Sequence, residues 1–130
     1  MKKDIGSRED IVNLLEAFYT KAFADDLIGK FFTEVMPLDL ETHIPLIADF
    51  WESIVFGTFS YQKNVMEVHR LIHEKSAIRK EHLDRWVKLF SETMNSKCEG
   101  PNATLMLQRA RSVATLMDIK LNHGPFNSAK

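Results

Sequence analysis

The stretch His73-Glu-Lys-Ser-Ala-Ile-Arg-Lys-Glu-His-Leu-Asp-Arg-Trp86 joins two predicted helices. In the second helix, apolar residues recur on one face, at Leu83, Trp86, Val87, Phe90 and Met94. Ser76 is expected to cap that helix, because its hydroxyl can accept a bond from a first-turn amide. A histidine that faces an aromatic-rich helix can offer a ring nitrogen to a flat, metal-centred cofactor. For an isolated histidine, a partly buried ring bonded to a backbone carbonyl is the commoner case.

Composition and charge limit the class of protein. The 130 residues are 45% apolar and 27% charged, which is typical of one soluble globular domain. The formal charge of −1 provides no basic surface for nucleic acid or an anionic membrane. Cys98 is the single cysteine, so an internal disulfide is excluded and a reducing, cytoplasmic location is expected. No apolar run is long enough to span a membrane.

The apolar spacing predicts helices throughout the chain. Ser7 reads as the N-cap of a first helix, whose apolar face is Ile11, Leu14, Leu15, Phe18, Tyr19, Ala22 and Phe23. Phe31 and Phe32 are expected in a short irregular segment. A second helix is placed from near Thr42, since a proline at position 45 is tolerated only in a first turn, and Gly57 ends it.

The second half of the sequence is also predicted to be helical. A third helix is expected over residues 64–73, and the helix that contains Trp86 runs to about Cys98. A break at 99–102 leaves Asn102 as the expected cap of a last helix, which Gly124-Pro125 closes. Residues 1–6 and 124–130 are expected to be frayed tails of a single domain, 1–130. No long stretch alternates with period two, so the fold is predicted to be all-α.

Two alternative kinds of site receive little support. His69 and His73 share a helical face at a spacing that can bind zinc, but a third ligand and a nearby glutamate base are missing. Cys98 lies at a predicted helix C-terminus beside Glu99, and both the helix end and the carboxylate oppose a thiolate. Two surface or helix-end histidines and an unreactive thiol are the simpler interpretations.

One set of residues supplies imidazoles, a phenol, an indole and apolar walls. Each member taken alone is expected in core packing, but together they suit a haem, with one histidine on iron and hydrogen-bond donors on the other side. The set is Tyr19, Phe32, His43, Ile47, Phe50, His73 and Trp86.

From Ile11 to about Leu121, the chain resembles a truncated haemoglobin of the third group. The resemblance rests on Ala17-Phe18-Tyr19, on His43 followed by Phe50-Trp51, on Tyr61 with Asn64-Val65-Met66, and most of all on residues 80–90, Lys-Glu-His-Leu-Asp-Arg-Trp-Val-Lys-Leu-Phe. This last run is similar to the family's tryptophan motif, with leucine at position 83 where phenylalanine is usual. The resemblance implies a 2-on-2 globin-like helical sandwich around a haem.

The resemblance also implies roles for particular residues. The family's proximal histidine stands thirteen residues before the tryptophan, which implies His73 as the ligand of a haem b iron, with His69, one turn earlier, as the alternative. Tyr19, His43 and Trp86 would be the distal residues that stabilise a bound ligand. The pocket would be lined by Phe32, Ile47 and Phe50.

The expected activity follows from that pocket. Dioxygen, nitric oxide and carbon monoxide would be the ligands, with redox chemistry such as nitric oxide or peroxide detoxification supported by an unidentified reductase. The alternatives are a haem-based ligand sensor and a non-catalytic helical binding module. A monomer or weak homodimer is expected. His43 is further predicted to act as a gate that titrates near the ordinary histidine pKa of about 6.5.

Overall fold

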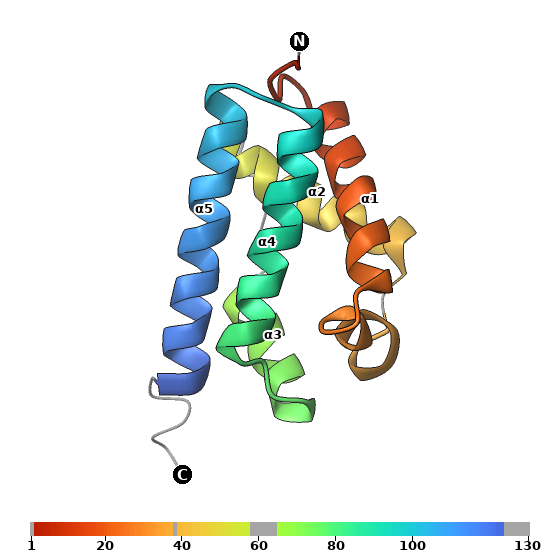
Figure 1. Ribbon diagram of the computed structural model, residues 1–130, viewed down its shortest axis with the longest axis vertical. Coiled ribbons are helices and arrows are strands. Elements are labelled where there is room, and N and C mark those ends of the chain that lie inside the picture. Colours follow the sequence, from red (N-terminus) through yellow and green to blue (C-terminus); the bar gives the residue numbers. More distant parts are fainter. Residues whose placement is uncertain (1, 38, 58–64, 124–130) are drawn as a thin grey trace.

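The computed structural model describes residues 2–37, 39–57 and 65–123 (Figure 1). Its elements are α1 (Arg8–Ala24), η1 (Phe31–Val35), α2 (Leu40–Phe56), α3 (Val65–Lys75), α4 (Lys80–Lys97), α5 (Pro101–Asp118) and η2 (Ile119–His123), where η1 and η2 are short π-helical turns. Within these ranges, the only β-type pairing is an isolated bridge between Lys3 and Cys98. The all-α prediction is confirmed. No helix among the described residues is both long and apolar enough to cross a membrane.

The helices form two packed pairs. Helix α1 packs against α2, and α4 packs against α5, while α1 also contacts α4 and α2 contacts α5 (Figure 1). Figure 1 shows α4 and α5 side by side and antiparallel, with α2 crossing behind them. The core between the pairs contains the fully buried Phe18, Phe90, Met94 and Met106. This arrangement is a sandwich of two helices on two.

Helix α1 begins where the sequence predicts. The Ser7 hydroxyl accepts a hydrogen bond from the Asp10 amide at 3.3 Å, which satisfies one of the first-turn donors. The predicted apolar face is inside the protein, since Ile11, Phe18 and Ala22 are almost fully buried. Tyr19 belongs to the same face, so its polar hydroxyl is carried into the interior.

Helix α2 begins two residues earlier than predicted. Asp39 is its N-cap, with side-chain oxygens that accept from the Glu41 amide at 3.2 Å and from the Thr42 hydroxyl at 3.0 Å. Pro45 therefore lies inside the helix, beyond its first turn, and the expected start near Thr42 is wrong. At the other end, Gly57 adopts the left-handed conformation (φ 69°) and closes the helix as predicted.

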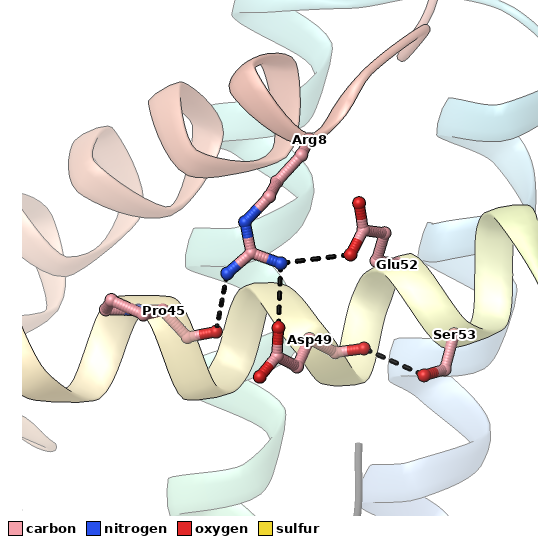
Figure 2. A network of polar contacts seen from close by, with 5 residues as sticks. All are labelled: Arg8, Pro45, Asp49, Glu52 and Ser53. Carbon is pink, nitrogen blue, oxygen red and sulfur yellow. Dashed lines mark hydrogen bonds and ion pairs between the residues drawn. The ribbon is translucent and has the colours of Figure 1, made fainter. Parts of the chain in front are cut away.

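Arg8 ties α1 to α2 next to this proline (Figure 2). Its guanidinium donates to the Pro45 carbonyl at 3.1 Å, to Asp49 at 2.7 Å and to Glu52 at 3.0 Å. The Ser53 hydroxyl donates to the Asp49 carbonyl one turn further along the helix. The three bonds from one cation fix the position of α2 along α1, and thereby the position of the side chains that α2 carries into the core.

The predicted caps of the last two helices are wrong. Ser76 belongs to the end of α3, where its amide bonds to the Ile72 carbonyl, and the N-cap of α4 is Arg79. Asn102 lies within the first turn of α5, not before it. The carboxylate of Asp4 caps α5 from outside the helix, accepting from the amides of Asn102 at 3.0 Å and Ala103 at 2.9 Å.

The first residues are consequently not a frayed tail. Ile5 is fully buried, and the Lys3 carbonyl accepts from the Glu99 amide at 3.1 Å. Gly100 has φ 148°, and a Cβ there would lie 2.5 Å from the Asp4 side chain, so the close approach requires glycine. The expectation of fraying is therefore wrong for residues 3–6. Residues 124–130 lie outside the described residues.

Two further boundaries differ from the predictions. Phe31 and Phe32 lie in an ordered π-helical turn, closed by the Met36 amide donating to the Phe31 carbonyl at 3.1 Å, so the predicted irregular segment is wrong. Helix α3 continues two residues past His73, to Lys75. Tyr61 and Asn64, which the resemblance used, lie outside the described residues.

We expect Asp4→Ala to destabilise the fold by about 1 kcal/mol, because two amides of α5 lose their acceptor. Burial opposes ionisation of Asp4, but the amides of Asn102, Ala103 and Ile5 outweigh it and lower the pKa of the carboxyl. Since the folded pKa is the lower one, this stabilisation is present at neutral pH and is lost as pH falls below about 4. Urea unfolding at pH 7 and pH 3 measures both effects. The exposed Glu99→Ala is the control, and equal losses in the two variants would contradict the cap.

Candidate functional site

A cavity of about 220 Å³ lies between the helices. It is far larger than the voids left in an ordinary packed core, which are about the size of a water molecule. Its walls are mostly apolar, and its polar groups come from four different helices. The lining residues are Leu15, Phe18, Tyr19, Ile28, Phe31, Phe32, Met36, His43, Ile47, Phe50, Trp51, His69, Ile72, Ile78, His82, Leu83, Trp86, Phe90, Val113 and Met117.

Tyr19 and His43 meet at this cavity. The Tyr19 hydroxyl and the His43 Nε2 are 3.0 Å apart, and the two rings are edge to face with their centroids 5.2 Å apart. Burial raises the pKa of the Tyr19 phenol, so the phenol keeps its proton. Burial, and secondarily the nearby His69, lower the pKa of His43, so its ring is neutral at pH 7. The pair can therefore hold a proton for donation into the cavity.

This bond corrects the predicted behaviour of His43. The ring is bonded to a buried phenol from α1, and burial lowers its pKa below the ordinary value of 6.5. Protonation must therefore overcome burial, and it would place a positive charge near His69. A gate that swings outward as pH falls through 6.5 is not what this environment favours.

The two histidines of α3 occupy different surroundings. His69 lines the cavity, whereas His73 is not among the lining residues. The Nδ1 of His73 accepts a hydrogen bond from the Ile78 amide at 2.9 Å. Because an amide N–H can only donate, Nδ1 bears no proton, and the neutral ring carries its hydrogen on Nε2. His73 thus fastens the turn between α3 and α4.

The predicted apolar wall is present. Phe32, Ile47 and Phe50 all line the cavity, from η1 and α2. Phe32 stacks on Phe23 with the centroids 5.5 Å apart and meets Tyr19 edge to face at 5.8 Å. Phe32 therefore limits the position of the phenol as well as forming part of the wall.

Trp86 stands at one end of an aromatic stack. Its ring lies parallel to Phe90 at 5.8 Å between centroids, and Phe90 in turn lies parallel to Trp51 at 5.4 Å. Phe18 contacts both Trp86 and Phe90 edge to face. All four rings line the cavity, so the stack places the indole of Trp86 on the same cavity as Tyr19 and His43.

Several lining residues were not predicted from the sequence. Phe31, Met36 and Met117 are ordinary core residues in type and carry no signal of a site. His82 is different, because a histidine in the first turn of a helix that faces an apolar cavity is unusual. Its Nδ1 accepts a hydrogen bond from the Arg79 amide at 2.9 Å, and this bond holds the ring at the N-terminus of α4. Its position in the tryptophan motif was visible in the sequence, but its direction was not.

Cys98 fits its predicted lack of reactivity. Burial, then the carboxylates of Asp10 and Asp4, raise the pKa of the thiol. These neighbours come from the N-terminal segment and α1, and not from Glu99 as the sequence indicated.

Comparison with known proteins identifies the class. The chain matches the family of bacterial-like globins over residues 3–118, and it belongs to that family. It is similar to the group 3 truncated haemoglobin of Campylobacter jejuni, with 27% identity over 118 residues that cover 88% of this chain and 91% of that one. The crystal structure of the group III truncated haemoglobin from Campylobacter jejuni superimposes with a TM-score of 0.81 at 26% identity, covering 95% of this chain and 97% of the other.

The fold is thus that of a group III truncated haemoglobin, and the resemblance stated from the sequence is confirmed. Membership of the globin family implies haem-based binding of diatomic gases.

We expect the free energy of unfolding to fall as pH drops below about 6.5. The folded state holds His43 with a lowered pKa, so its contribution is present above the unfolded value of 6.5 and is lost as pH falls through the folded one. His82 adds to the slope, because burial and Lys30 lower its pKa too. Urea titrations from pH 8 to pH 5 measure the slope, which His43→Gln should reduce. An unchanged slope in that variant would show that His43 is not held neutral by its surroundings.

Proposed function

We propose that the cavity binds haem b and that His69 is the residue bonded to its iron. The observation that carries this proposal is the position of His69 on an apolar cavity that also contains the Tyr19–His43 pair. His73, the first choice from sequence spacing, is less suitable, because the Ile78 amide occupies the lone pair of its Nδ1 and the proton occupies Nε2. We therefore prefer His69, one helical turn earlier, as the residue bonded to the iron.

The residues present suit a porphyrin. Phe32, Ile47 and Phe50 offer flat or branched apolar surface, and a porphyrin ring needs such walls to be shielded from water. When bound, haem would supply an iron that binds dioxygen, nitric oxide or carbon monoxide. The chain would supply a cavity of suitable shape, apolar walls that exclude water, and hydrogen bonds to that ligand.

Tyr19, His43 and Trp86 are proposed as the distal residues. When His43 carries its proton on Nε2, it donates to the Tyr19 oxygen, and the phenol hydrogen is then directed elsewhere, toward a ligand in the cavity. His43 in this tautomer orients Tyr19, which is the donor. Trp86 adds an indole N–H to the same cavity. Donors in a dry site retain ligands, so slow release is expected.

Slow release favours redox chemistry on bound gases over their transport. We propose detoxification of nitric oxide, in which nitric oxide, dioxygen and one electron give nitrate, or of hydrogen peroxide, in which peroxide, two electrons and two protons give two water molecules. The electron would come from a separate reductase, in the cytoplasm that the single cysteine suggests. A gas sensor would bind the same ligands without turnover, so the two roles separate on consumption of nitric oxide by the purified protein with dioxygen and a reductant. If the protein binds nitric oxide but does not consume it, the role of gas sensor is the one supported.

We expect His69→Ala to lose the imidazole that would hold the haem iron and so to change the absorption spectrum, with recovery of the spectrum on addition of free imidazole. His73→Ala is the matched control, and should keep a wild-type spectrum with some loss of stability from the unfastened turn after α3. Absorption spectra of the ferric, ferrous and carbonyl forms measure both. The reverse pattern would make His73 the ligand.

We expect Tyr19→Phe to change the rate of dioxygen release by roughly tenfold or more, since a hydrogen bond to a charged acceptor contributes about 1.5–3 kcal/mol. Aromatic volume is kept, so packing changes little. Trp86→Phe should also alter release, and His43→Leu should act through Tyr19, with little further effect in the Tyr19→Phe background. Stopped-flow displacement by carbon monoxide measures these rates. Wild-type rates in both Tyr19→Phe and Trp86→Phe would reject the distal assignment.

A further inference from the structure

His82 is the histidine on the cavity wall that the proposed gas chemistry does not use. The other polar members are the Tyr19–His43 pair, the two indoles of Trp51 and Trp86, and the proposed iron ligand His69; the Trp51 ring is stacked on Phe90. His82 comes from the first turn of α4, beside the N-cap Arg79, and its ring is partly buried. A polar ring on an otherwise apolar wall is costly unless it meets a polar partner.

The proton of His82 has a defined place. Nδ1 accepts from the Arg79 amide at 2.9 Å, so the neutral ring carries its hydrogen on Nε2. Burial and the charge of Lys30 lower the pKa of His82 and favour this neutral form, although Glu81 acts in the opposite direction. Nε2–H is therefore a fixed hydrogen-bond donor, and it suits an acceptor oxygen and not a metal ion.

Two cationic side chains lie near His82. Phe31 meets His82 edge to face at 5.0 Å, and the Lys30 ammonium lies 5.4 Å from the centre of the Phe31 ring. Arg79 is next to His82 and donates to the Asn122 side chain at 3.0 Å, which holds it near α5. Lys30 and Arg79 both act on the charge state of His82, so both cations are within electrostatic range of its ring. The N-terminal end of α4 adds its own partial positive charge.

We propose that the His82 Nε2–H and the Lys30 ammonium form the anion-binding edge of the cavity and hold the carboxylates of the bound porphyrin. This inference rests on the proposed haem binding and goes beyond it, since it fixes which way the haem faces. The apolar rim of the porphyrin would then lie inside, among the aromatic rings, and its two propionates at the η1–α4 edge. Arg79 contributes charge there without needing direct contact.

The test compares haem with haem dimethyl ester, in which both carboxylates are blocked. Each is loaded into the full chain, and its loss to excess apomyoglobin is timed. We expect His82→Leu to release haem about tenfold faster, because a hydrogen bond to a charged acceptor is lost. The exposed Lys30→Met should have a smaller effect, about twofold to fivefold. Neither variant should change release of the dimethyl ester.

Three further variants and two outcomes make the test decisive. His82→Gln keeps an N–H at a similar distance and should release haem more slowly than His82→Leu. Lys80→Met removes an exposed lysine of α4 that is paired with Asp84, and should leave both rates unchanged. The double variant Lys30→Met with His82→Gln should combine the effects of the two single variants, and only on the release of haem.

Two outcomes would overturn a proposal. Equal acceleration of release for both porphyrins would overturn the inference and make His82 a packing residue, while the proposal of haem binding would stand. A wild-type chain that takes up neither porphyrin would overturn the haem proposal itself.

Discussion

The hydrogen bond between the Tyr19 hydroxyl and the His43 Nε2 is the contact on which the site depends. A buried phenol without a partner is costly, and so is a buried imidazole. Each satisfies the other at 3.0 Å, and the bond joins α1 to α2 across the cavity. Arg8 fixes the same two helices from the outside, by three bonds to α2. The two contacts together hold α1 and α2 at a fixed separation beside the cavity.

Two histidines illustrate how a backbone amide fixes the position of the proton on a ring. His73 and His82 each accept an amide hydrogen at Nδ1, which leaves a donor at Nε2. His73 holds together the turn between α3 and α4, whereas His82 lines the cavity from the first turn of α4. His69 lines the cavity, four residues before His73, and is the residue proposed to bind iron. His73 and His82 share the same kind of amide contact, so their different surroundings, and not the contact itself, distinguish them.

Much of the helical fold was visible in the sequence because its signals are local. The apolar spacing of α4, the Ser7 cap and the Gly57 stop each involve residues within a few positions of one another. The cap of α5 was missed because Asp4 stands almost a hundred residues before the amides that it accepts from. Spacing within the motif favoured His73, with His69 as the alternative on the same helical face. The proposal of His69 rests instead on the contact of His73 with the Ile78 amide in the following turn, which spacing along the sequence does not indicate.

The aromatic stack gives the molecule an optical property. The chain contains two tryptophans, and Trp51 and Trp86 lie at the two ends of a single stack on Phe90. Both indoles also line the cavity. Tryptophan emission from this protein therefore originates beside the cavity, so a porphyrin bound there would quench it by energy transfer. Intrinsic fluorescence can consequently follow filling and emptying of the cavity in real time, without an attached dye.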